Sequence, residues 1–356
     1  MFILQTSSKF LYPQLFTRRN RSIKKQYATI RYLHDKNNEK KIKFYVVNRY
    51  ILYLKDYEKH IERRFPNAVG LYRSFMDGTK KFIQDVKLYY SIVRSLNKKV
   101  KSLPDLTRKE LELFDQMPRD MLKLTPILFF SALPFTNYVI FPLIYFFPKQ
   151  MLSQHFWTLQ QRVDFNRSFL HERLMHNKPI FRHLQEQLVR LKGHELYKPW
   201  EEVLGKIGSG VQPDVEEIID CKDLFVNDPY NLNYLRGSHI KHLLHLHNLN
   251  TFFWFRRKRL FEKALLLKEM DSAIMREGGI HNLPVEALRT SCYIRGLNPT
   301  NMKNEDMINW LNKWIKVSRA IDQDSVSLLL HCPILLGYNE PSNWTLIYAY
   351  SRKQIL

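Results

Sequence analysis

The sequence predicts an all-helical protein with one membrane-spanning helix, and three patterns support this prediction. Apolar residues recur at helical spacing over residues 69–96, which is typical of an amphipathic helix. Residues 124–148 form a run of 25 residues without a charged side chain, and such a run can cross a hydrocarbon core of about 30 Å. Runs of alternating apolar and polar residues do not exceed about four residues, so we expect no sheet.

The composition is that of a globular chain with a strongly basic N-terminal third. Hydrophobic residues make up 45% and charged residues 25% of the 356 positions, which excludes a disordered chain and a polytopic membrane protein. The formal charge of +22 would attract nucleic acid, anionic lipid or an acidic partner. Because residues 1–123 carry most of this excess, a single basic nucleic-acid cleft in the C-terminal part is not expected. The three scattered cysteines favour a reducing compartment over a disulfide framework or a zinc ribbon.

Residues 1–35 have the composition of a mitochondrial transit peptide. The segment is rich in arginine, and its first acidic residue is Asp35. It also lacks the continuous apolar stretch of a secretory signal. A disordered basic tail that binds RNA or lipid is the alternative.

Residues 36–120 are predicted to form a basic amphipathic helical region. Lysines and arginines occupy the faces of the 69–96 helix outside its apolar stripe. Such a helix can lie on an anionic membrane, or it can pack on a neighbouring helix with its basic face in water. The pair Thr107 and Glu110 has the spacing of a capping box, so the next helix should begin there.

Residues 121–148 are predicted to be the membrane segment, a kinked helix. Prolines recur every eight residues in the uncharged run, and each interior proline removes a backbone hydrogen bond and bends the helix. Transmembrane helices tolerate such prolines when neighbouring groups satisfy the freed carbonyls. The alternative is a buried hairpin in a water-soluble core. The residues that we expect to shape the span are Pro126, Pro134, Phe135, Pro142 and Pro148.

Residues 149–356 are predicted to form a soluble helical domain. Thr158 and Gln161 have the spacing of a second capping box, which would open a helix ending near His176. Further helices are expected over residues 179–192 and 200–206. A small hinge over residues 205–210 precedes a helix that starts after Pro213.

No motif in the chain predicts catalysis or a resident metal. His239, His242, His245 and His247 form the densest group of metal-ligand residues, but no acidic residue or cysteine lies within a turn or two. We interpret them as neutral imidazoles at a helix end or on the surface. Cys292 is interpreted as a small buried thiol. Phosphate-binding, nucleotide-binding, hydrolase and zinc motifs are missing from the sequence, so we predict no catalytic residue, cofactor, metal or small-molecule substrate.

Two groups of short motifs resemble a known family. The first group is LTRKE at 106–110, LTP at 124–126, LPF at 133–135 and FPKQML at 147–152. The second group is LPVEAL at 283–288, SCYIRGL at 291–297, WLNKW at 310–314 and LLL at 328–330. Together they resemble the LETM-domain proteins, and HFWT at 155–158 resembles the short members of that family. The resemblance covers about residues 40–340.

This resemblance implies a proline-bearing transmembrane segment followed by a helical domain regarded as ribosome-binding. It also implies residence in the mitochondrial inner membrane and roles in mitochondrial organisation, ion balance and contact with the mitochondrial ribosome. Two departures matter. The chain has no EF-hand loop, and it carries Thr136 and Asn137 where the family has an acidic residue after the Pro-Phe pair. An intramembrane carboxylate is what a proton-coupled exchanger would use.

From the residues and the resemblance we expect a non-enzymatic inner-membrane scaffold whose helical LETM domain binds the mitochondrial ribosome. The alternative is a component of cation/proton exchange. Arg289 and Arg295 are expected to be exposed and to contact ribosomal phosphate, although Arg295 could equally cap its helix ahead of Gly296. Other expected partners are membrane lipid, and further copies of the chain or neighbouring membrane proteins.

The orientation of the predicted single span is the least determined feature. Basic residues are more frequent before the span than after it, which weakly places the N-terminal flank in the matrix. The resemblance instead places the C-terminal domain in the matrix, and we follow the resemblance.

Overall fold

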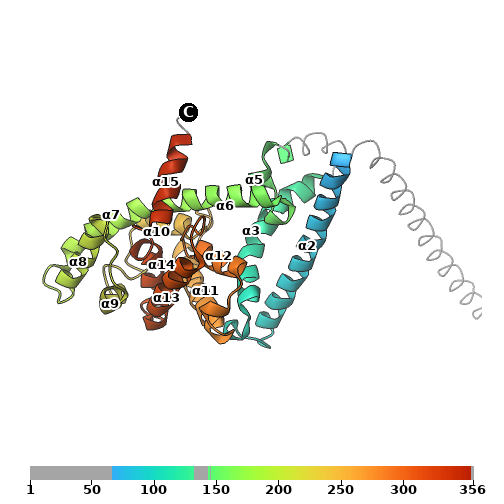
Figure 1. Ribbon diagram of the computed structural model, residues 1–356. Coiled ribbons are helices and arrows are strands. Elements are labelled where there is room, and N and C mark those ends of the chain that lie inside the picture. Colours follow the sequence, from blue (N-terminus) through green and yellow to red (C-terminus); the bar gives the residue numbers. More distant parts are fainter. Residues whose placement is uncertain (1–65, 132–142, 145, 354–356) are drawn as a thin grey trace, which may run out of the picture. The chain divides into compact units, whose positions relative to one another are not determined.

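The computed structural model describes residues 66–131, 143, 144 and 146–353, and within these ranges it contains helices and no strand. The all-helical prediction is therefore confirmed for the described part of the chain. In chain order, with η for short 3-10 helices, the elements are α2 (Pro66–Asn97), η1 (Leu103–Asp105), α3 (Arg108–Ser131), α5 (Pro148–Met151), η2 (Gln154–Phe156), α6 (Leu159–Leu174), α7 (Asn177–Leu188), η3 (Val189–Leu191), α8 (Tyr197–Gly208), α9 (Val215–Asp220), η4 (Lys222–Phe225), α10 (Gly237–Leu246), α11 (Arg256–Arg276), η5 (Ile280–Asn282), α12 (Val285–Ile294), α13 (Asn304–Ala320), α14 (Val326–Leu335) and α15 (Pro341–Lys353) (Figure 1).

The chain divides into two compact units, residues 1–77 and 78–356. Of the first unit, the structure describes only residues 66–77, which are the start of α2. The predicted transit peptide lies outside the described residues. The second unit contains the remainder of α2 and every later element, and the following description concerns this unit.

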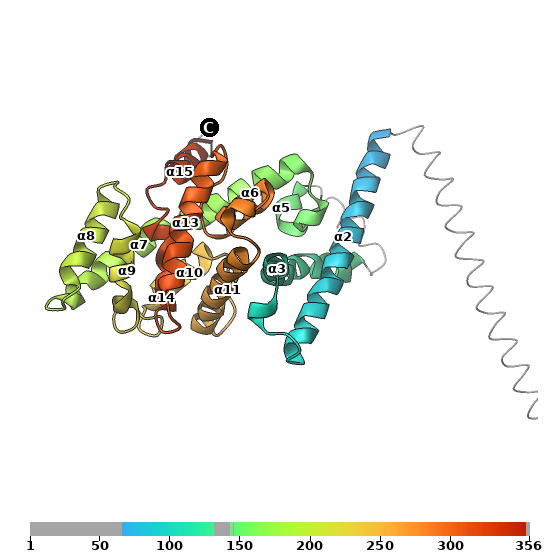
Figure 2. The same ribbon diagram turned by 60° about the horizontal axis from the view of Figure 1, so that its bottom comes forward.

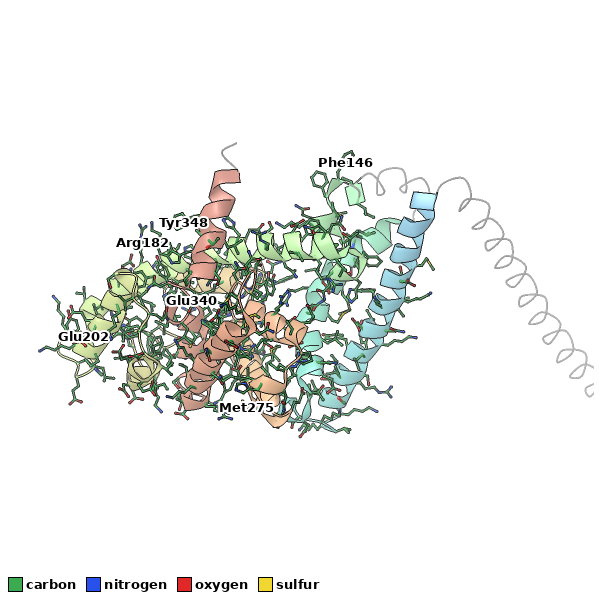
Figure 3. All side chains as sticks on the ribbon, viewed as in Figure 1. Phe146, Arg182, Glu202, Met275, Glu340 and Tyr348 are labelled. Atoms are coloured by element: carbon green, nitrogen blue, oxygen red, sulfur yellow. The ribbon has the colours of Figure 1, made fainter. Side chains whose placement is uncertain are left out.

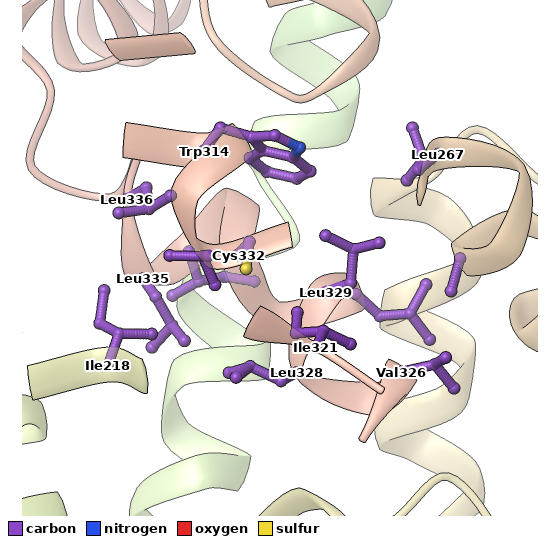
Figure 4. Close-up of a cluster of buried hydrophobic side chains, with 14 of the residues drawn as sticks. Ile218, Leu267, Trp314, Ile321, Val326, Leu328, Leu329, Cys332, Leu335 and Leu336 are labelled. Carbon is purple, nitrogen blue, oxygen red and sulfur yellow. The ribbon is translucent and has the colours of Figure 1, made fainter. Parts of the chain in front are cut away.

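The core of the second unit is built around α14. Every residue from Val326 to Leu335 is buried, as expected of a helix that is apolar on all sides. Leu328, Leu329 and Cys332 of this helix lie in one cluster with Leu267 of α11 and Trp314 of α13 (Figure 4). This cluster joins α14 to α11 and α13.

Helix α3 belongs to this packed unit, and it lies beside α11 (Figures 1 and 2). Leu111 and Met117 are fully buried, and the Lys263 ammonium of α11 lies 2.6 Å from a carboxylate oxygen of Asp115. Helix α3 therefore packs with elements that follow residue 149. Sequence patterns located the uncharged run but not the contacts of the helix that leads into it.

Both predicted capping boxes are present. The Thr158 hydroxyl accepts from the Gln161 N–H at 3.2 Å, and the Gln161 side chain accepts from the Thr158 N–H at 3.0 Å. Thr107 and Glu110 make the corresponding pair at the start of α3. The expected helices over 179–192 and 200–206 correspond to α7 and α8. The predicted hinge over 205–210 begins too early, because α8 continues through Gly208.

Helix α2 packs on a neighbouring helix in the part that belongs to the second unit. The Tyr89 ring lies 5.9 Å from the Phe114 ring of α3, and Ile92 is buried in the main core. Ile83 and Tyr90, which the helical spacing placed on the apolar stripe, are exposed. This part of α2 therefore packs on a neighbouring helix, which was one of the two predicted alternatives. Its contact face is narrower than the predicted apolar stripe.

Candidate functional site

A group of polar side chains lies where α2, α3 and η2 meet, just before the uncharged run, with Asp120 and His155 nearly buried and the Asp85 side chain 38% exposed. Gly78 of α2 allows this close approach, because a Cβ atom there would lie 2.6 Å from the His155 carbonyl oxygen. The edge of the Phe82 ring faces the His155 ring at 5.5 Å. The imidazole is therefore held between helices rather than in water.

The His155 imidazole lies between two carboxylates. Its Nε2 donates to Asp85 Oδ2 at 2.9 Å, and its Nδ1 lies 3.0 Å from the Ser153 hydroxyl and 4.0 Å from Asp120 Oδ2. Asp120 is 6% exposed and accepts a hydrogen bond from the Gln116 amide at 2.7 Å. We define Asp85, Asp120 and His155 as the acid–imidazole group.

The burial of Asp120 changes its acidity. Burial raises the pKa of the Asp120 carboxyl, although the Gln116 hydrogen bond and the nearby His155 and Lys123 favour its ionised form. When no cation is bonded directly to a buried carboxylate, its desolvation costs more free energy than its remaining interactions return. The arrangement can therefore hold and exchange a proton beside an imidazole.

The two ends of the uncharged run come together beside this group. Lys123 precedes the run and Lys149 follows it, and each ammonium nitrogen lies 4.7 Å from the centre of the Phe169 ring. The two nitrogens are thus separated by no more than twice that distance. Lys149 also donates to Glu172 at 2.6 Å and to Ser168 at 2.7 Å.

The two flanks of the run lie close together. A straight helix of the run's length would separate its ends by roughly 37 Å, whereas Leu124 and Ile127 share a buried cluster with Leu152 and Trp157. Residues 132–142 and 145 lie outside the described residues, so the single span stays a prediction. No helix in the described ranges combines the length and apolar character needed to cross a membrane.

The predicted span residues fall partly within the described chain. Pro126 lies inside α3 and is exposed, and Pro148 is the first residue of α5. Pro134, Phe135 and Pro142 lie outside the described residues. Directly before α5, Phe146 is 71% exposed, and its side chain points away from the helical domain (Figure 3).

Arg289 is exposed on α12 as expected, whereas the expected exposure of Arg295 is wrong. The Arg295 guanidinium is 1% exposed and donates to Asp271 Oδ1 through Nε and Nη2, at 3.0 and 2.6 Å. Asp271 also accepts from the Trp314 indole at 3.0 Å. The sequence could not reveal this arrangement, because the ion pair joins residues on different helices. The Arg295 backbone does cap α12, the role considered as the alternative.

The histidine group lies at the helix end that was one of its two predicted positions, since His245 is in the last turn of α10 and His247 is its C-cap, but it is not wholly on the surface. His239 and His247 are buried, and the pKa of each of the four imidazoles is lowered chiefly by desolvation. His239 Nε2 lies 3.0 Å from Nε2 of His331 on α14. No group of metal-ligating side chains occurs among the described residues. Cys292 is fully buried and burial raises the pKa of its thiol to about 12, in agreement with a small packing residue.

Two candidate features were not found from the sequence. The acid–imidazole group joins positions from three separate elements, so no local spacing signals it. The second feature is a stretch of aromatic residues followed by cations at 252–259, which is visible in the sequence. The exposure of its aromatic rings in the structure marks this stretch as a candidate. The sequence alone did not, because four adjacent aromatics are also compatible with a buried strand or helix.

Comparisons with known proteins match the packed unit. A family model described as "LETM1-like, RBD" matches residues 106–335. "LETM1 domain-containing protein 1" of Xenopus tropicalis is 31% identical over 285 residues, which are 80% of this chain and 81% of the relative. The Homo sapiens protein of the same name is 29% identical over 310 residues, 86% of each chain. The "Mitochondrial proton/calcium exchanger protein" of Drosophila melanogaster is 28% identical over 237 residues, 65% of this chain and 23% of the relative.

Proposed function

The chain belongs to the LETM1-like family, and from this membership we propose that it is a non-enzymatic scaffold of the mitochondrial inner membrane whose helical domain docks on the mitochondrial ribosome. The observation that carries the proposal is the extent of the family match, residues 106–335, which coincides with the packed helices from α3 to α14. The mitochondrial part is supported by the composition of residues 1–35 and by the name of the Drosophila relative.

We propose further that the uncharged run 124–148 enters the membrane and returns on the side from which it came. The support is the shared position of Lys123 and Lys149 at the Phe169 ring. This arrangement removes a conflict in the sequence. The excess of basic residues places the upstream flank in the matrix, and the resemblance places the C-terminal domain there. Both placements hold if the run re-enters.

Thiol labelling in mitoplasts tests this topology. The three native cysteines are buried, so an introduced cysteine can be labelled selectively. Asn97→Cys reports on the upstream flank and Val211→Cys on the domain, since both positions are exposed. With a membrane-impermeant reagent, both should stay unlabelled in mitoplasts and react after detergent is added. Reaction of just one of them in intact mitoplasts would indicate a single crossing.

Co-sedimentation with mitochondrial ribosomes tests the docking proposal. The full chain in detergent is required, because a fragment starting at residue 150 would lose α3 and leave Lys263 without Asp115. Binding through phosphates should weaken steeply as salt rises. Arg289→Ala should reduce the salt slope by about one if Arg289 contacts phosphate, and Arg182→Ala on α7 is a matched exposed control. Absence of co-sedimentation at low salt would remove the ribosome from the proposal.

Cation/proton exchange is the second candidate, because the acid–imidazole group supplies a buried carboxyl of raised pKa at the entrance of the run. The family carries an acidic residue within the uncharged stretch, and in this chain Asp120 would supply that acidic group just before the stretch instead. Proton-driven potassium or calcium flux into liposomes containing the chain tests this candidate. Asp120→Asn should abolish the flux, and Asp306→Asn, at an exposed position of α13, should not. If wild type moves neither cation, exchange is excluded for the isolated chain.

A further inference from the structure

The connection between α10 and α11 exposes an unusual amount of aromatic surface. Residues 252–259 read FFWFRRKR, four aromatics followed by four cations, and we call this segment the aromatic–cationic loop. Phe252 and Trp254 are each 83% exposed, and Phe255 is 76% exposed. Single exposed apolar residues are ordinary, but several adjacent aromatics form the kind of patch that marks an interaction surface.

Local hydrogen bonds order the backbone on either side of these rings. The Phe252 N–H donates to the Asn250 side chain at 2.8 Å, and the Arg259 guanidinium donates to the Asn250 carbonyl at 2.5 Å. Phe255 has a φ of 57°, a left-handed conformation that bulky residues rarely adopt. Backbone strain of this kind persists where the surroundings fix it, and it is concentrated at binding sites.

The aromatic and cationic side chains are separated along the segment. The aromatics precede α11, whereas the cations occupy its first turns, which are anchored by the fully buried Leu260. Arg257 donates to the carbonyls of Leu232 and Leu235 at 3.2 and 3.0 Å. The Arg259 guanidinium lies 5.7 Å from the centre of the Phe253 ring, so the loop presents exposed aromatic rings directly beside cations.

The charge around the loop is uniformly basic along the sequence. Residues 229–261 contain six lysines and arginines and no acidic residue. Acidic side chains do approach from elsewhere: Glu262 lies 3.9 Å from Lys258, and Asp324 lines a hollow shared with Arg257 and Lys258. Arg256 is exposed and makes a 3.2 Å hydrogen bond to the Thr251 carbonyl, which leaves further guanidinium donors for an anion.

We propose that the aromatic–cationic loop docks on an anionic lipid surface, with Phe252, Trp254 and Phe255 entering the interfacial layer and Arg256 and Lys258 contacting lipid phosphate. Exposed aromatic rings beside exposed cations match a bilayer interface, where tryptophan is enriched and cations remain at headgroup level. A single-stranded RNA platform stacks successive bases on aromatic side chains along a basic groove that follows the strand, whereas here the four aromatics are consecutive in one short loop. This site is separate from the uncharged run, so it deepens the proposed membrane role without depending on ribosome binding.

Depth measurement with a spin label tests the proposal in the full chain. The chain is incorporated into nanodiscs, so that the uncharged run already has lipid, and vesicles of the same lipid are then added. Phe252→Cys carries the label, and Val211→Cys, on a loop without aromatics, is the control. Accessibility to oxygen and to a water-soluble nickel reagent reports immersion. Phosphatidylcholine alone is compared with phosphatidylcholine containing phosphatidylglycerol.

The expected result is immersion of the label at position 252 in disc or vesicle lipid, increased by phosphatidylglycerol and reduced by the double variant Arg256→Glu, Lys258→Glu. The label at position 211 should remain in water. Full water exposure at position 252 with both lipids overturns the proposal, as does shielding that occurs only when ribosomal RNA is added. The run's own insertion is measured separately by assembly into the disc, so failure of the loop is distinguishable from failure of membrane attachment.

Discussion

Asp271 and Asp120 are both buried carboxylates, but their surroundings differ. Asp271 accepts from Arg295 twice and from the Trp314 indole once. Asp120 accepts from the neutral Gln116 amide, and the nearest His155 ring nitrogen is 4.0 Å away. A buried charge with a full set of donors stabilises one packing arrangement. A buried acid without a bonded cation is instead a candidate for proton transfer.

The positions of the two acids in the fold agree with a packing role for Asp271 and a proton-transfer role for Asp120. Asp271 lies on α11 within the unit's interior, where its bonds tie α11 to α12 and α13. Asp120 lies on α3 directly before the uncharged run. The comparison therefore predicts opposite responses to the same chemical change, the removal of one negative charge.

The largest expected effect is at the fully bonded site. Asp271→Asn leaves the Arg295 guanidinium buried without an anion, which should lower the free energy of unfolding by about 3–5 kcal/mol. Chemical denaturation of the full chain in detergent measures the change. Asp306→Asn, at an exposed position, should change the free energy by no more than about 0.5 kcal/mol. An equally small change for Asp271→Asn would mean that the pair contributes little to packing.

His331 extends the comparison to a buried group that is kept neutral. The imidazole is fully buried, its Nδ1 donates to the Ser327 carbonyl at 2.6 Å, and its Nε2 faces His239 at 3.0 Å. Burial lowers the pKa of His331 to about 4 from the ordinary 6.5. A second proton would also place two N–H groups against each other. The folded state therefore binds this proton less readily than the unfolded chain does.

Because burial lowers the pKa of His331, this residue makes the folded state less stable in acid than at neutral pH. The contribution of His331 is complete above pH 6.5 and is lost as the pH falls towards 4, by about 1.4 kcal/mol per pH unit. His331→Gln should therefore flatten the acid limb of a stability profile measured between pH 7 and pH 4. His281→Gln, on the surface, should leave the slope unchanged. Equal slopes for wild type and His331→Gln would show that another group causes the acid sensitivity.

Sequence patterns predicted local structure well and cross-chain geometry poorly, for a physical reason. The capping boxes at Thr107 and Thr158 follow from short-range rules, and both are observed. The burial of Arg295 and the approach of His155 to Asp120 depend on which helices pack together, and no local pattern encodes this. The same limitation concealed the shared position of Lys123 and Lys149 at the Phe169 ring, because lipid affinity is a property of composition whereas this contact is a property of packing.

Asp120→Asn is expected to change the free energy of unfolding least. It is also the most discriminating variant, because the sign of its effect should be opposite to that of Asp271→Asn. Since burial raises the pKa of Asp120, its ionised form destabilises the fold. The contribution of Asp120 to stability is therefore complete below the unfolded pKa of 3.8 and is lost as the pH rises through the folded value. Asp120→Asn removes this cost at neutral pH and can retain a hydrogen bond with Gln116. We expect a gain below about 1 kcal/mol, measured by denaturation at pH 7 and absent at low pH. A loss of several kcal/mol would show that Asp120 is as fully bonded as Asp271, and the acid–imidazole group would then be structural.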